Sequence, residues 1–315
     1  MAALCITSFL MFLIGAFGIF GNLNLITVTL RTLPALKRSR CGLLIGILAF
    51  ADLICIVFEW QNAIRLFVGT QNFRRSCFWA ISPYLYVINF QATLILVIAA
   101  DRVFAIFFPF KYRTLDFCIY VTVCMLPGVV CASTIFGLAL VYMDDDRIEA
   151  CNPPLGYPPL VSRIWNRWIL VVDCLTILLY VLAFVVLYVK TRQVTKSSPE
   201  YAFLRQQKKL MHTLSIVIVA FVCSWFFCHF SVLFVTLIGL DENTVHVFQT
   251  IAVIPAMMCY SQNYYIYLWR SKEYRGLFKE QLRLLFNCCS TRYCSSNTVT
   301  VKVISNLSVG SSERG

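Results

Sequence analysis

Three acidic side chains lie within stretches that are otherwise apolar, where an ionised group is costly and therefore informative. They are Asp52, Glu59 and Asp173. A carboxylate in such a setting can hold a cation, carry a proton or accept hydrogen bonds. Asn22 and Asn263 lie in similar apolar stretches, and we expect both to be hydrogen-bond partners of Asp52. The alternative is that these polar groups only join one helix to another.

The elements that carry these residues are long and almost uncharged. Of 315 residues, 59% are hydrophobic and 13% are charged, against roughly 25% charged in soluble domains, and about 20 apolar residues cross a bilayer as a helix. We predict an all-α integral membrane protein. A seven-transmembrane helix bundle is expected over 1–270, an amphipathic juxtamembrane helix over 271–287 and a disordered cytoplasmic tail over 288–315. The predicted spans are about 4–30, 42–67, 78–108, 117–143, 166–189, 210–240 and 244–269.

The net charge of +12 is distributed unevenly along the chain. With the N-terminus outside, the predicted cytoplasmic segments hold 21 basic and 6 acidic residues, whereas the outer loops hold 6 of each. Because Lys and Arg accumulate on the cytoplasmic side of membrane proteins, we expect the N-terminus outside and the C-terminus inside. The basic excess then serves topology and contacts with membrane lipids, and we expect no nucleic-acid partner.

The three histidines give no support for an enzyme. His212 lies near the inner edge of a predicted span, His229 within that span and His246 near an outer edge. They are too far apart to assemble a metal cluster, and no nucleophile motif is present. We therefore expect no metal, no cofactor and no enzymatic activity.

Most of the 15 cysteines lie inside predicted spans, where a thiol packs as a small apolar group. Cys77, at the outer start of the third span, and Cys151, in the long outer loop, both face the oxidising side. We predict that they form a disulfide, the alternative being two free thiols. Three cysteines after the amphipathic helix are candidates for palmitoylation, with unmodified thiols as the alternative. These are Cys288, Cys289 and Cys294.

Several motifs recur in register along the predicted spans. They are Gly21-Asn22, Leu48-Ala-Phe-Ala-Asp52, Cys77 placed twenty-five residues before Arg102, Asp101-Arg102-Val-Phe-Ala-Ile-Phe-Phe-Pro109-Phe-Lys-Tyr112, Phe221 with Trp225, and Asn263-Tyr-Tyr-Ile-Tyr267. Together they resemble the rhodopsin-like (class A) G-protein-coupled receptors over nearly the whole chain. The ending from Asn263 to Arg275 is most similar to the nematode serpentine chemoreceptors of class sx.

This resemblance implies roles for the residues that carry it. A core polar network would join Asn22, Asp52 and Asn263. A second set would couple ligand binding to a heterotrimeric G protein, and it comprises Asp101, Arg102, Pro109, Tyr112, Asn263 and Tyr267.

Four positions depart from the pattern of the resembling receptors. Val103 replaces the usual Tyr after Asp-Arg, and Tyr264 and Phe227 replace prolines in spans seven and six. The kinks that those prolines support must therefore arise otherwise or be absent. Gln207 stands where an acidic residue often pairs with the Arg. We expect Arg102 to pair with Asp101 but with no carboxylate of the sixth span. This predicts an inactive state that is only weakly stabilised by contacts between the third and sixth spans.

The register of the same motifs indicates the ligand class. Tyr84 occupies the place of the Asp of amine receptors, and Met257 that of the retinal-binding Lys of opsins, so the resemblance implies neither a monoamine receptor nor an opsin. Glu59 and Asp173 each have an alternative role, in which the acid pairs with His229 or with an Arg such as Arg167. The alternative for Trp225 is a plain core aromatic. The predicted ligand pocket comprises Glu59, Tyr84, Asp173, Trp225 and His229.

We therefore expect a receptor in the plasma or ciliary membrane of a sensory cell that binds an extracellular small-molecule cue and activates a heterotrimeric G protein. A neuropeptide-type receptor is the alternative, because the acidic run Asp144–Asp146 of the outer loop suits a cationic peptide. A transporter or channel is the alternative from another class, although the sequence has neither an inverted repeat nor a matched pair of broken helices.

Overall fold

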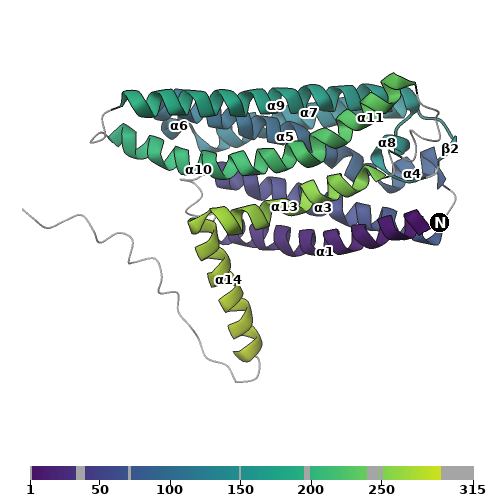
Figure 1. The fold of residues 1–315 in the computed structure, drawn as a ribbon, viewed down its shortest axis with the longest axis horizontal. Coiled ribbons are helices and arrows are strands. Elements are labelled where there is room, and N and C mark those ends of the chain that lie inside the picture. The colour runs from purple at the N-terminus through teal and green to yellow at the C-terminus, as the bar shows by residue number, and fades with distance from the viewer. Residues whose placement is uncertain are drawn as a thin grey trace, which may run out of the picture.

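The computed structural model describes residues 2–32, 40–69, 72–148, 150–194, 199–239, 248 and 251–291. Its long helices run side by side along the long axis of the molecule (Figure 1). They are α1 (Ala2–Arg31), α3 (Arg40–Val68), α5 (Ser82–Phe107), α7 (Phe117–Val141), α9 (Pro159–Gln193), α10 (Pro199–Phe221), α11 (Phe227–Ile238) and α13 (Val253–Arg270).

Six helical segments in the described residues are long and apolar enough to cross a membrane. They are Ile6–Arg31, Cys41–Val68, Ser82–Phe107, Phe117–Val141, Pro159–Gln193 and Met211–Val235. The shorter α13 lies inside the bundle, where it packs against α1, α3 and α10. The sequence predicts the last span over 244–269, of which residues 244–247 and 249–250 lie outside the described residues. This arrangement is consistent with a seven-helix membrane bundle.

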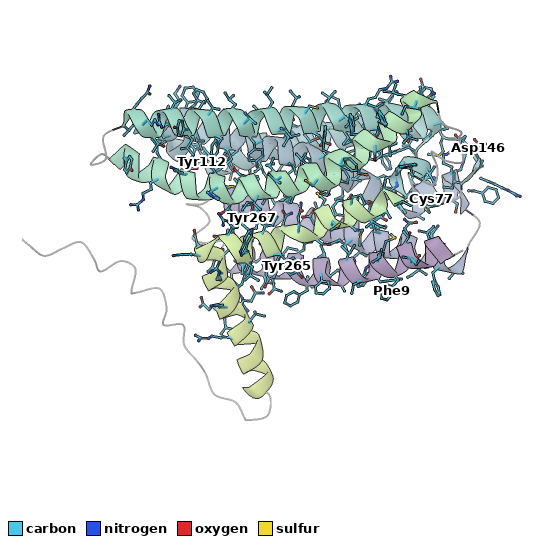
Figure 2. The ribbon with its side chains drawn as sticks, in the orientation of Figure 1. Phe9, Cys77, Tyr112, Asp146, Tyr265 and Tyr267 are labelled. Carbon is cyan, nitrogen blue, oxygen red and sulfur yellow. A yellow bond between two sulfur atoms is a disulfide. The ribbon has the colours of Figure 1, made fainter. Side chains whose placement is uncertain are left out.

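Large apolar side chains cover the outward faces of these helices. Phe9 points away from the bundle in Figure 2 and is 67% exposed. Similar exposed residues follow α1, α7 and α9 along their length: Phe17, Leu126, Val130, Leu178, Val181 and Phe184. Soluble monomers rarely expose contiguous apolar surface of this extent, whereas lipid chains solvate it. The surface therefore indicates a multi-pass membrane protein.

One end of the bundle is closed by short elements from two loops. The antiparallel strands β1 (Asn72–Phe73) and β2 (Arg147–Ile148) pair Asn72 with Ile148. The helices α4 (Arg74–Ala80) and α8 (Pro153–Gly156) lie beside them, at the same end as the N-terminus (Figure 1). The sequence predicts one span over 78–108, but the structure divides this range at Ile81, between α4 and α5.

A π-helical turn, η1 (Val222–Phe226), joins α10 to α11 at the place where the expected proline is missing. The backbone amide of Phe227 donates to the carbonyl of Val222, five residues earlier. A π-turn widens one helical turn and is a recognised cause of helix bending. The sequence leaves two possibilities for the sixth span, a kink that arises without proline or no kink, and the π-turn favours the first.

The other missing proline, replaced by Tyr264, lies where α13 meets α1. A Cβ atom added at Gly21 would lie 2.8 Å from the Cβ of Tyr264, so only glycine allows this approach. The ring of Tyr264 also packs on Phe278 at a centroid distance of 4.5 Å. Phe278 belongs to α14 (Lys272–Thr291), which leaves the bundle at a steep angle in Figure 1. The sequence predicts an amphipathic helix in this region, over 271–287.

Candidate functional site

The half of the bundle that lies towards α4 and α8 holds a buried carboxylate beside two tyrosines. Glu59 on α3 is 1% exposed, and the hydroxyl of Tyr84 on α5 donates to its Oε1 at 2.5 Å. Asn62 donates to Oε2 at 3.1 Å, and the hydroxyl of Tyr260 on α13 lies 3.4 Å from that of Tyr84. The structure thus brings Glu59 and Tyr84 together. Among the described residues Glu59 pairs with no histidine or arginine.

An aromatic row connects this carboxylate centre to the sixth helical segment. The ring of Trp225 on η1 lies 5.7 Å from that of Tyr260 and 4.7 Å from that of His229 on α11, measured between centroids. The ring of Trp165 on α9 lies 5.2 Å from His229 on the other side. Trp225 is 5% exposed, and its ring joins His229 to the Glu59 centre.

His229 and Asp173 have different surroundings from those of Glu59. Nδ1 of His229 lies 2.7 Å from Oδ1 of Asn166, so the partner of this imidazole is an amide and not one of the buried acids. Asp173 is buried on α9, and its Oδ2 has no hydrogen-bond partner in the described part of the chain. Buried polar atoms are seldom left unpaired in folded proteins. Asp173 thus lies outside the row that links the other four pocket candidates.

A second polar centre lies deeper, around Asp52. Oδ2 of Asp52 accepts from Asn263 at 2.9 Å, as the sequence predicts, and Oδ1 accepts from Gln91 at 2.5 Å. Asn22 does not bind Asp52: its amide donates to the backbone carbonyl of Tyr260 at 2.9 Å. The prediction for Asn22 is therefore wrong in its partner, because α1 packs on α13 and its amide meets that backbone first. Asp52, Gln91 and Asn263 line a cavity whose space measures about 500 Å³, including the part that opens to the surroundings.

The C-terminal end of α5 holds a buried arginine. Arg102 is 2% exposed and forms an ion pair with Asp101. Its Nη1 donates to Oε1 of Gln207 on α10 at 3.2 Å, and its Nη2 donates to the hydroxyl of Tyr112 at 3.0 Å. Tyr120 on α7 donates to Oδ1 of Asp101 at 3.1 Å. The cross-helix contact that the sequence predicts to lack a carboxylate is thus made by an amide.

A short helix carries Tyr112 back to this arginine. Pro109 begins α6 (Pro109–Thr114), where the missing amide proton of proline costs nothing. Burial raises the pKa of Tyr112, so its hydroxyl stays protonated at neutral pH. Tyr267 lines the cavity below Asp52 and packs on Tyr274 of α14 at 4.9 Å. Figure 2 shows Tyr112 and Tyr267 towards the end of the bundle that is opposite Cys77.

The elements β1, β2, α4 and α8 form a lid at one end of the bundle, and covalent and ionic contacts hold it together. The predicted disulfide between Cys77 and Cys151 is confirmed. Arg74 pairs with Asp144 and with Asp146, the latter at 3.2 Å, and Arg75 pairs with Asp145 at 3.4 Å. The acidic run of the loop is therefore balanced by two arginines of the same lid, which leaves little negative charge there for a cationic peptide.

Tyr157 inserts the lid into the bundle. Its hydroxyl donates to the carbonyl of Leu85 at 3.1 Å and accepts from Asn89 at 2.9 Å, both on α5. Burial raises the pKa of Tyr157, so the hydroxyl remains a donor. The loop after β2 therefore packs down onto the same helix that carries Tyr84.

Sequence reasoning missed several polar residues of these centres, among them Gln91, Tyr260 and Asn166. Gln91 lies seven residues after Tyr84 and eleven before Arg102, which places it on the same face of α5. Tyr260 lies three residues before Asn263 on α13, again on one face. These spacings were available signals, whereas the contact of Asn166 with a helix far along the chain left none. The side chains of Cys288 and Cys289, and all of Cys294, lie outside the described residues.

Apolar membrane helices, a disulfide-linked outer lid and buried polar centres in series are features of a membrane receptor of the G-protein-coupled type. A family model for the serpentine type 7TM GPCR chemoreceptor Srsx matches residues 15–282. The chain belongs to this chemoreceptor family, which confirms the predicted class sx, and the family is one of receptors rather than enzymes. No curated protein matches the chain.

Proposed function

We propose that this chain is a seven-span receptor, with its N-terminus outside and its C-terminus inside, that binds an extracellular small molecule and activates a heterotrimeric G protein. Residues 1–270 form the receptor domain, 271–287 the juxtamembrane helix and 288–315 a cytoplasmic tail. Its place is the plasma or ciliary membrane of a sensory cell. Palmitoylation of Cys288, Cys289 or Cys294 would give α14 a second anchor in the inner leaflet.

The observation that carries this proposal is the burial of Arg102 beneath α10. A guanidinium with several donors is costly to bury unless acceptors surround it. Asp101 and Tyr112 satisfy it from its own side, and Gln207 satisfies it from α10. When α10 moves away, the Gln207 contact is lost and the arginine surface becomes accessible to a cytosolic partner.

Ligand binding in the outer half can drive this movement only if the ligand binds the open arrangement more tightly. The route available is the aromatic row, because Trp225 lies on η1 directly above α10. A change in the packing of His229 or Tyr260 against Trp225 alters the bend between α10 and α11. The small-molecule assignment is supported by the closed lid, where Tyr157 and the arginine-balanced acidic run leave little room or charge for a peptide.

The test is nucleotide exchange on a purified heterotrimeric G protein by the full chain in lipid nanodiscs, screened against pooled metabolites. We expect at least one pool to accelerate exchange. Arg102→Gln should abolish that acceleration, because the exposed cation is lost. Arg192→Gln is the matched control, since Arg192 is an exposed arginine at the C-terminal end of α9, and it should retain the response.

The outcome that overturns the proposal is flux of a substrate or ion through proteoliposomes with no exchange on any G protein. That result would favour the transporter or channel. Equal exchange by Arg102→Gln and Arg192→Gln would also contradict the role given to the buried arginine.

A further inference from the structure

A cavity separate from the Glu59 centre lies between the outer halves of α9 and α11. Its space measures about 630 Å³, including the part that opens to the surroundings. Figure 1 shows α11 running beside α9 toward the lid. Pro154 of α8 and Ala252, just before α13, also border it. Of the predicted pocket residues, only His229 lines this cavity.

The ionic character of this cavity is positive. Arg163 and Arg167 line it from α9, four residues apart and so on one face of the helix. Among the described residues, no aspartate or glutamate lines it. Arg74 and Arg75 of the lid pair with acids, but within the described part of the chain Arg163 and Arg167 form no ion pair. The fork of N–H donors on an arginine guanidinium matches the geometry of a carboxylate.

A buried donor in the same cavity lacks an acceptor. Trp165, between the two arginines in the chain, lines the cavity and is 2% exposed. Its indole Nε1 has no hydrogen-bond partner in the described residues. An unpaired buried N–H is costly, so such a group is expected to meet water or a ligand oxygen. This observation is independent of the arginine charges and also favours a ligand with an acceptor.

Two polar side chains of the cavity, Asn166 and His229, orient each other. Nδ2 of Asn166 donates to the backbone carbonyl of His229 at 3.4 Å, which leaves Oδ1 of Asn166 to accept from Nδ1 of the same histidine. Nδ1 of the imidazole therefore carries a proton. The ring is thereby held between Trp165 and Trp225.

The opposite wall is apolar. Val232, Leu233 and Leu237 of α11 line the cavity, and Leu237 lies one helical turn beyond Leu233. A ligand that satisfies both walls must have an anionic head and an apolar tail. Its tail would contact α11, which connects through His229 to Trp225 and thus to the bend above α10.

We propose that this cavity binds a small organic acid with an apolar tail, its carboxylate held by Arg163 and Arg167 and its tail packed on Val232, Leu233 and Leu237. The inference names the ligand class of the receptor proposed above, and for its signalling consequence it rests on that function. Binding itself requires only the cavity.

The probe is radiolabelled decanoate, with the full-length chain in phosphatidylcholine nanodiscs and empty nanodiscs as background. Decanol and decylamine, which share the chain but not the anionic head, serve as competitors. We expect unlabelled decanoate to displace the label at a concentration at least tenfold below that needed of either competitor. The double variant R163Q/R167Q should lose at least tenfold in affinity, because a charge-assisted contact is removed. R75Q/R147Q removes two exposed arginines of the lid and should bind within about twofold of the unaltered chain.

The tail contact has its own variant. Leu233→Trp narrows the apolar wall, so it should shift the preferred chain length from decanoate toward hexanoate while the preference for the acid head remains. Equal displacement by decylamine or decanol, or unchanged binding by R163Q/R167Q, overturns the inference, and the first comparison needs no variant to fold. If decanoate binds as expected but causes no nucleotide exchange, the cavity assignment stands and the proposed signalling function is contradicted instead.

Discussion

The contact between Arg102 and Gln207 gives the sharpest prediction about the resting state. Both side chains are buried, and the Nη1–Oε1 distance is 3.2 Å. The substitution Gln207→Glu keeps the length of the side chain and replaces a neutral acceptor with a charged one. It should stabilise the closed arrangement of α5 and α10 and therefore lower the basal activation of the G protein.

The magnitude follows from the distance. Two unit charges 3.2 Å apart at an effective dielectric constant of about 20 attract by roughly 5 kcal/mol. Desolvation of the new carboxylate and its repulsion by Asp101 offset most of this attraction. Because charge-assisted bonds are about twice as strong as neutral ones, we take a net gain of about 1.5 kcal/mol. The open population, and basal exchange with it, should then fall about tenfold.

The assay is basal nucleotide exchange in nanodiscs at equal receptor density, together with the melting temperature of the ligand-free chain, which should rise. Gln193→Glu adds the same charge at an exposed position near the end of α9 and should leave both readouts unchanged. Gln207→Met, which removes the acceptor, should raise basal exchange. Unchanged or increased basal exchange in Gln207→Glu, with normal folding, would refute the idea that the contact between Arg102 and residue 207 stabilises the closed arrangement.

Two further predictions concern the lid and the topology. The double variant C77S/C151S should lower the melting temperature and the surface expression, because the disulfide closes a loop with a sequence separation of 74 and such cross-links contribute about 2–4 kcal/mol. Cys174→Ser, at an exposed free thiol, should change neither quantity. Equal behaviour of the two variants would contradict the stabilising role of the disulfide. An N-terminal epitope should be labelled on intact cells and a C-terminal epitope only after permeabilisation, whereas labelling of both on intact cells would mean that α13 does not span the membrane.

The helical segments were largely predictable because uncharged length alone determines what a bilayer accepts as a span. Motif spacing also placed Asp52 against Asn263 and Arg102 against Asp101. The partner of Asn22 was not predictable in this way, since its amide meets a backbone carbonyl, which carries no sequence signal. The arginine-lined cavity was missed for a related reason: Arg163 and Arg167 were counted as loop charges, although α9 begins at Pro159 and makes them part of a helix.

The π-turn at η1 also affects how this chain should be compared with its relatives. One extra residue within a helical turn rotates everything beyond it by about 100° relative to a continuous α-helix. A single helical wheel drawn from α10 through α11 would therefore assign the outer residues to the wrong sides. A relative that has one residue fewer in this segment can present the same outer face with an unbroken α-helix. Sequence alignments of the family should accordingly allow a one-residue gap at Val222–Phe226, because a gap there changes helix type and leaves side-chain positions intact.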